Sequence, residues 1–147
     1  MVSIVRRFIE ESFELLVGDP ETVFRISLAV HELLENAAKY SVGGSSGLSV
    51  HFESNGSGVT IKLTNQSTPE HIARLRESIE EIQSSKEPIA LYHTLMRRTA
   101  GIPDESRLGL ARIRAEGDLA LSLEIDHLTV TIIANSICPP ARMYPHG

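Results

Sequence analysis

Three polar residues whose types can do chemistry lie about one helical turn apart in the first third of the chain. Glu32, Asn36 and Lys39 all fall in the segment His31-Glu-Leu-Leu-Glu-Asn-Ala-Ala-Lys-Tyr-Ser41. On a helix, at about 100° per residue, they occupy a stripe roughly 60° wide. A carboxylate can take a proton from a nucleophile, and an amide oxygen one turn away can ligate magnesium. A lysine one turn further on can meet a phosphate as a point charge.

These residues belong to a segment, 20–40, that the sequence predicts to be a helix. Asp19 is suited to cap it and Pro20 to occupy its first position. Apolar residues follow at spacings of three and four, the helical signature: Val23, Ile26, Val30, Leu33, Ala37 and Tyr40. The polar stripe borders this apolar stripe, where the wall of a cleft would be. On spacing alone, a solvated helix face with Asn36 as a cap or an exposed amide is the commoner explanation.

The rest of the chain alternates helical and strand patterns. Apolar and polar residues alternate over 48–52 and 59–63 on either side of a hairpin signal at 54–58, and again over 119–125 and 128–132. Asp126 and His127 are expected to form the tight turn between the last two strands. Helical patterns cover four further ranges: 3–17, 68–84, 88–99 and 108–116.

This order predicts one α/β domain over residues 1–147, with a core over about 20–135 and an irregular, Pro-rich tail over 136–147. Strands with one apolar face predict a two-layer α+β sandwich, in which helices cover one face of a mixed, mostly antiparallel sheet. Helices 20–40 and 68–84 both need to bury an apolar stripe, so they are expected on the same face.

The amino-acid composition argues against several classes of function and binding site. The net charge is −5, with no block of basic residues, which argues against nucleic-acid binding. Cys138 is the single cysteine, so neither an intrachain disulfide nor a cysteine pair for zinc is available. No apolar run approaches the roughly 18 residues of a membrane span, and charges interrupt the N-terminal stretch, unlike a signal peptide. A cytoplasmic protein without a membrane partner is expected.

The segment from Glu32 to Ser41 closely resembles the N box of the GHKL, or histidine kinase-like, ATPases, which reads Glu-x-x-x-Asn-Ala-x-Lys-Tyr. The order of the surrounding elements also fits this superfamily, over about 20–135. The resemblance implies a histidine kinase-like ATPase fold that binds Mg-ATP. It makes Glu32 the general base or polarising carboxylate and Asn36 the magnesium ligand. Lys39 and Tyr40 then belong to the nucleotide site, with Lys39 on a phosphate.

The two glycine-rich boxes of the superfamily are altered. Asn65 stands where the first box has the aspartate that receives the adenine amine, and the glycines of that box are missing. An asparagine oxygen can still accept one hydrogen bond, without the charge of a carboxylate. Of the second box only Gly109 remains, at the expected opening of a helix where phosphate can meet backbone amides. Arg107 is a candidate phosphate contact; a packing glycine and a solvated arginine are the alternatives.

By size the resemblance is greatest to stand-alone regulatory serine/threonine kinases of bacterial partner-switching pathways. It implies a small regulatory protein, similar to an anti-sigma-factor antagonist, as the partner, and it is compatible with a homodimer through the first helix. Two alternatives stay open. One is a degenerate module that keeps the shape and sequesters a partner without nucleotide turnover. The other is a catalytically silent half of an oligomeric assembly.

Overall fold

The computed structural model describes residues 20–43, 45–53, 58–98 and 105–136. The helix expected over 3–17, most of the hairpin signal at 54–58, the loop before residue 105 and the expected tail beyond 136 lie outside these ranges.

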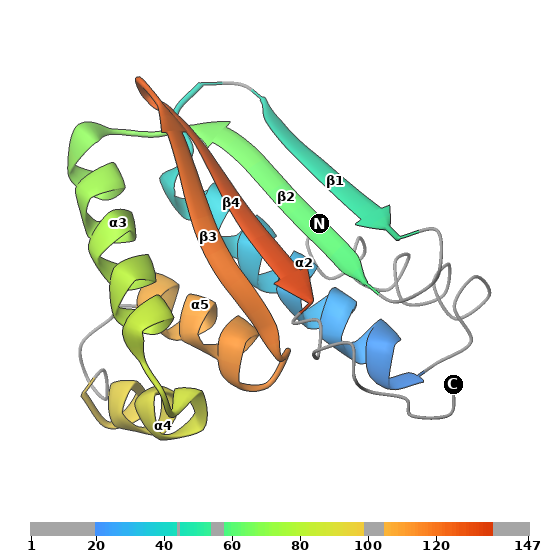
Figure 1. The fold of residues 1–147 in the computed structure, drawn as a ribbon. Coiled ribbons are helices and arrows are strands. Elements are labelled where there is room, and N and C mark those ends of the chain that lie inside the picture. The colour runs from blue at the N-terminus through green and yellow to red at the C-terminus, as the bar shows by residue number, and fades with distance from the viewer. Residues whose placement is uncertain (1–19, 44, 54–57, 99–104, 137–147) are drawn as a thin grey trace.

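A single four-stranded sheet forms one layer (Figure 1). Its spatial order is β1-β2-β4-β3, from β1 (Ser46–Phe52), β2 (Val59–Gln66), β3 (Leu119–Asp126) and β4 (Thr129–Ser136). Every neighbouring pair is antiparallel, so no strand makes the sheet mixed. The α/β sandwich expected from the strand patterns is therefore confirmed.

The register places the apolar positions of all four strands on one face. Leu63 pairs with Leu48 on one side and with Ile132 on the other, and Ile132 pairs with Leu123. The turn between the last two strands is one residue later than expected, because His127 adopts a left-handed conformation with φ 56°. Leu128 is consequently an exposed turn residue and does not begin a strand.

Four helices are described: α2 (Pro20–Tyr40), α3 (Pro69–Ser84), α4 (Pro88–Arg98) and α5 (Glu105–Ala115). The start of α3 is fixed by Thr68, whose hydroxyl accepts a hydrogen bond from the backbone N–H of His71 at 3.2 Å. Helix α5 begins earlier than the expected residue 108, so Gly109 lies in its second turn. The backbone amide of Gly109 is thus not at the helix N-terminus, and the anion site expected from that position is not formed there.

Helices α2, α3 and α5 cover the apolar face of the sheet, behind it in Figure 1, while α4 packs on α5. The expectation that helices 20–40 and 68–84 share one face is confirmed by a single core cluster, which includes Leu33, Ile61, Ile79, Ile113 and Ile132. These five side chains are at most 2% exposed. Helix α2 is thereby held rigidly against β2 and α5, which fixes the polar stripe beside its apolar face. None of the described helices is both long and apolar enough to cross a membrane.

Candidate functional site

The carboxylate of Glu32, on α2, lies against Gly109 of α5. A Cβ atom built on Gly109 would collide with the carboxylate oxygen of Glu32. A side chain at 109 would displace the Glu32 carboxylate from this position, so the place of the carboxylate depends on the residue type at 109. Two positions singled out from separate segments of the sequence are therefore brought into contact.

Arg112 of α5 forms an ion pair with the Glu32 carboxylate, and Glu116 and Tyr92 lie close to this pair. Arg112, one turn after Gly109, places its guanidinium Nη1 3.5 Å from Glu32 Oε1, and its Nε donates to Glu116 Oε2 at 2.9 Å. The hydrogen bond to Glu116 raises the pKa of Arg112. Burial, followed by the negative charge of Glu116, raises the pKa of Tyr92, against the opposing charge of Arg112. We call Glu32, Tyr92, Gly109, Arg112 and Glu116 the Glu32 cluster.

Asn36 lies one turn after Glu32 and is almost completely buried, with 6% of its surface exposed. Its amide nitrogen Nδ2 has no hydrogen-bond partner. Buried polar groups are nearly always satisfied, and leaving one unsatisfied costs about 1–3 kcal/mol. The amide nitrogen of Asn36 is therefore available to donate a hydrogen bond to a polar ligand. It lies one helical turn from Glu32.

A second group of polar residues, four of them buried, lies where the end of α2 meets the end of β2 and the start of α3. The Tyr40 and His71 rings stack with centroids 3.9 Å apart and an angle of 10° between their planes. Ser67 Oγ donates to the Tyr40 carbonyl oxygen at 3.1 Å. Asn65, two residues before Ser67, uses its Nδ2 to donate to the Gln66 carbonyl oxygen at 3.1 Å. We call Asn36, Tyr40, Asn65, Ser67 and His71 the α2–β2–α3 corner.

Most buried polar residues of the described ranges lie in this corner. Of the six buried polar residues in the described ranges, four belong to it, namely Asn36, Asn65, Ser67 and His71. His71 is 8% exposed, and its Nε2 has no hydrogen-bond partner. The corner and the Glu32 cluster follow one another along α2. Together they form one candidate site.

The burial of His71 predicts a pH dependence of stability. Burial, with a smaller effect of the Arg74 cation, lowers the pKa of His71 from its ordinary value of 6.5. As pH falls below that value, the unfolded chain takes up a proton that the folded chain resists, so the free energy of unfolding decreases. His71→Phe removes this contribution and keeps the ring stack. Urea midpoints at about pH 7.5 and about pH 5.5 should differ more for the wild type than for His71→Phe. If the midpoint changed equally with pH in both proteins, the pH dependence would not come from His71.

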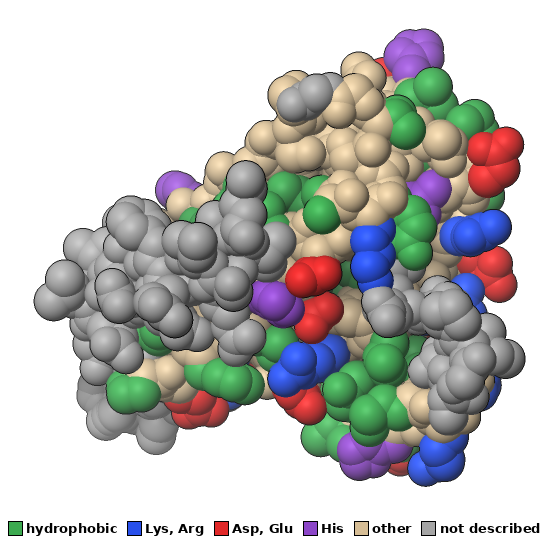
Figure 2. Space-filling view, turned by 180° about the vertical axis from the view of Figure 1, so that it is seen from behind, with side chains coloured by type: hydrophobic (Ala, Val, Ile, Leu, Met, Phe, Trp, Pro, Cys, Tyr) green, Lys and Arg blue, Asp and Glu red, His purple; other side chains and the backbone are tan. Residues whose placement is uncertain are grey.

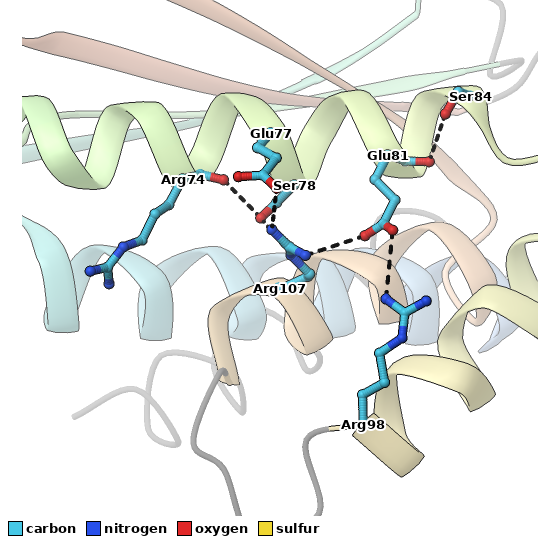
Figure 3. A network of polar contacts seen from close by, with 7 residues as sticks. All are labelled: Arg74, Glu77, Ser78, Glu81, Ser84, Arg98 and Arg107. Carbon is cyan, nitrogen blue, oxygen red and sulfur yellow. Dashed lines mark hydrogen bonds and ion pairs between the residues drawn. The ribbon is translucent and has the colours of Figure 1, made fainter.

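The structure places the remaining predicted site residues elsewhere. Lys39 is exposed in the last turn of α2. Arg107 points to α3: its Nε donates to Ser78 Oγ at 3.0 Å, and its guanidinium lies 3.8 Å from Glu77 and 3.5 Å from Glu81 (Figure 3). The structure thus brings Glu32 and Gly109 into contact, with Asn36 one turn further along α2, and it places Tyr40 and Asn65 in the α2–β2–α3 corner. It does not bring Arg107 to this site.

The helix-covered side of the molecule carries acidic, basic and histidine side chains near its middle, beside an apolar area (Figure 2). The sequence analysis missed the other residues of the site, namely Ser67, His71, Tyr92, Arg112 and Glu116. For Arg112 a signal existed, because it lies at i+3 from Gly109 and thus on the same face of α5. No local pattern marks His71.

No family model matches the chain, and no curated protein matches it either. Among solved structures, the chain is similar to a chain in the crystal structure of the SiaB-SiaC complex from Pseudomonas aeruginosa, with a TM-score of 0.68 and 15% sequence identity. The match covers 91% of this chain and 81% of that chain. At this level of identity, the similarity establishes a shared fold over nearly the whole chain.

Proposed function

We propose that this chain is a regulatory, ATP-binding serine/threonine protein kinase or ATPase of a bacterial partner-switching pathway. The contact of the Glu32 carboxylate with Gly109 is the observation that carries the proposal. It joins the carboxylate of the N-box-like segment to the surviving glycine of the second box, two motifs that the resemblance assigns to one nucleotide site. The shared fold with a chain of the SiaB-SiaC complex supports the same conclusion.

One observation fits a nucleotide at this site, whereas magnesium at Asn36 is carried by the resemblance to the N box. The Asn36 amide is buried and unsatisfied at Nδ2, so it has hydrogen-bonding capacity to give to a ligand. Bound Mg-ATP supplies the phosphoryl group and a cation that neutralises charge on its oxygens. In the proposal Asn36 ligates magnesium through its amide oxygen and Lys39 contacts a phosphate.

Glu32 acts in this proposal as the general base that takes the proton of the attacking hydroxyl. Its side chain is 16% exposed and held between Gly109 and Arg112, so its carboxylate has a defined place at the edge of the core. Precise placement of a base contributes typically 10²–10⁴-fold to a proton-transfer step, as an order of magnitude. Arg112 keeps the carboxylate oriented without occupying both of its oxygens.

The partner in this proposal is a small regulatory protein resembling an anti-sigma-factor antagonist. The similar chain comes from a complex of two proteins, SiaB and SiaC, which supports a protein partner for this fold. A serine or threonine of that partner presents the hydroxyl to Glu32.

A protein-binding module without nucleotide turnover is the second candidate. Arg107 favours it, because α3 holds its guanidinium through Ser78, Glu77 and Glu81. So does the tight packing of Gly109 on Glu32, which leaves no room for even one added methyl group. In this case the chain sequesters its partner and needs no general base.

Asn65→Asp separates the two candidates. Asn65 commits its amide nitrogen to the Gln66 carbonyl, which leaves the amide oxygen as the acceptor for an adenine amine. A carboxylate forms a stronger, charge-assisted bond, so ATP is expected to bind about tenfold more tightly. Calorimetric titration of ATP at fixed magnesium measures the change.

Asn135→Asp, a matched change on the opposite face of the sheet, is the control, and circular dichroism establishes that both variants are folded. Unchanged or weaker binding in Asn65→Asp would show that Asn65 does not contact the base. No heat with either protein, while a partner is still retained in a pull-down, would favour the binding module.

A further inference from the structure

Strand β1 forms one edge of the sheet, and its residue types leave that edge open to pairing (Figure 1). Ser46–Phe52 contains no charged residue and no proline, and it pairs with β2 without a bulge. Five of its seven residues are exposed. Proteins protect edge strands with charges, prolines and bulges, and an edge strand without them is a template for an added strand.

Alternate residues of β1 direct their backbone groups away from the sheet. The backbone N–H of Glu53 donates to the Gly58 carbonyl oxygen at 2.9 Å, so these two residues are a hydrogen-bonded pair. Because such pairs alternate with non-hydrogen-bonded pairs along an antiparallel ladder, Ser49 also bonds to β2. Leu48 and Val50 therefore point their N–H and C=O groups outward, where no group of the described residues bonds to them.

The opposite edge of the sheet, β3, is protected. Helices α3 and α5 pack on β3, and Gln83 of α3 donates its Nε2 to the Leu121 carbonyl oxygen at 2.9 Å. Glu124 and Asp126 add exposed negative charge to this strand. None of the described helices packs on β1 in this way. Among the described strands, β1 is therefore the one with an edge suited to accept another strand.

The residue pattern of β1 fits a second copy of the same strand. Leu48, Val50 and Phe52 share the helix-covered face, because they pair with buried residues of β2. Antiparallel pairing centred on Val50 places Leu48 of each copy opposite Phe52 of the other. On the open face it places Ser49 opposite His51. Apolar residues thus meet apolar residues, polar residues meet polar ones, and the outward backbone groups of both copies are paired.

The charges beside this edge also favour a second copy. Glu53, just after β1, and Lys62, opposite Ser49 on β2, are exposed on the open face. With regular sheet spacing, pairing centred on Val50 brings the Cα of Glu53 to roughly 12 Å from that of Lys62 in the other copy, within reach of two long side chains. The two Lys62 residues stay roughly 16 Å apart and the two Glu53 residues roughly 20 Å apart. Opposite charges are therefore closer across this interface than like charges.

We propose that two copies of this chain pair through the β1 edge, so that their sheets join into one continuous antiparallel sheet. The backbone groups of Leu48 and Val50 form the central hydrogen bonds. This inference goes beyond the proposed function and does not depend on nucleotide binding.

Leu48→Pro tests the pairing, because it removes one outward N–H and leaves the hydrogen bonds between β1 and β2 in place. Sedimentation velocity of the full-length wild type should show dimers replacing monomers as concentration rises. The proline should weaken this association at least about tenfold. Leu48→Ala is the matched control: it removes the same side chain, which is 36% exposed, and keeps the N–H, so it should dimerise nearly as the wild type does. Circular dichroism establishes that both variants are folded.

Amide hydrogen exchange, measured by NMR on the wild type, locates the interface independently. The N–H groups of Leu48 and Val50 should exchange more slowly in the dimer than in the diluted monomer. Lys62→Glu should weaken the dimer, because it places a second negative charge near Glu53 of the other copy. A wild type that stays monomeric at millimolar concentration, or a dimer that Leu48→Pro leaves intact, would overturn the inference. Should Leu48→Pro not fold, the exchange measurement decides, and unchanged exchange at these two N–H groups in a dimer would overturn it.

Discussion

Replacing Glu32 with glutamine is expected to lower the rate of γ-phosphate transfer from Mg-ATP by about 10²–10⁴-fold, with ATP affinity nearly unchanged. Glutamine keeps the shape of the side chain beside Gly109 and its hydrogen bond from Arg112, so the packing of α2 on α5 persists. What it loses is the ability to take a proton. An effect on rate without an effect on binding is the signature of a general base.

The measurement is release or transfer of labelled γ-phosphate, combined with titration of ATP into the same protein. Glu35→Gln is the matched control, since Glu35 lies on the same helix and pairs only weakly with His31 at 3.9 Å. It should transfer phosphate at the wild-type rate. Full activity in Glu32→Gln would refute the role of Glu32.

Asn36→Ala should remove the magnesium dependence of ATP binding. The loss in magnesium-dependent affinity should be at least about 10- to 100-fold, the size of effect that even outer-shell partners of a metal site produce. The fold should not suffer, because alanine is the best helix former and the substitution removes a buried, unsatisfied amide. A loss of binding together with unchanged or higher stability points to a ligand-binding role.

Calorimetric titration of ATP with and without magnesium measures this change. Asn135→Ala on the opposite face of the sheet is the control, and it should behave as the wild type. If Asn36→Ala kept the magnesium dependence, the amide would not be the metal ligand.

Much of the fold follows from patterns that are local in the sequence. The three- and four-residue spacing of α2 and the alternation in the strands indicated both the elements and the buried face, because these periods are set by backbone geometry. The start of α5 was misplaced because glycine disfavours a helix interior by about 1 kcal/mol relative to alanine. Tertiary packing overrides that preference, because α5 packs on α2 and α4 with the Glu32 carboxylate against Gly109.

The candidate site, like the fold, could be predicted from the sequence only in part. Glu32 and Asn36 could be predicted to share a face because both lie on one helix. The position of Arg107 could not be predicted from the sequence. Arg107 and Gly109 are two residues apart on α5, a rotation of about 200° around the helix axis, so they lie on nearly opposite faces. Which of these faces packs on α2 is decided by the tertiary structure. The contributions of Arg112 and His71 depend on how α5 and α3 pack on α2, which no local pattern contains.

Thermal unfolding of the full-length protein with and without Mg-ATP tests the central claim most directly. A ligand that binds only the native state stabilises it by about 2.7 kcal/mol at a concentration of 100 times its Kd. For a domain of this size, that should raise the midpoint by about 5–10 °C, increasing with ATP concentration. Asn36→Ala should show no magnesium-dependent increase. A wild-type midpoint that stays constant across ATP concentrations would contradict a nucleotide site on α2.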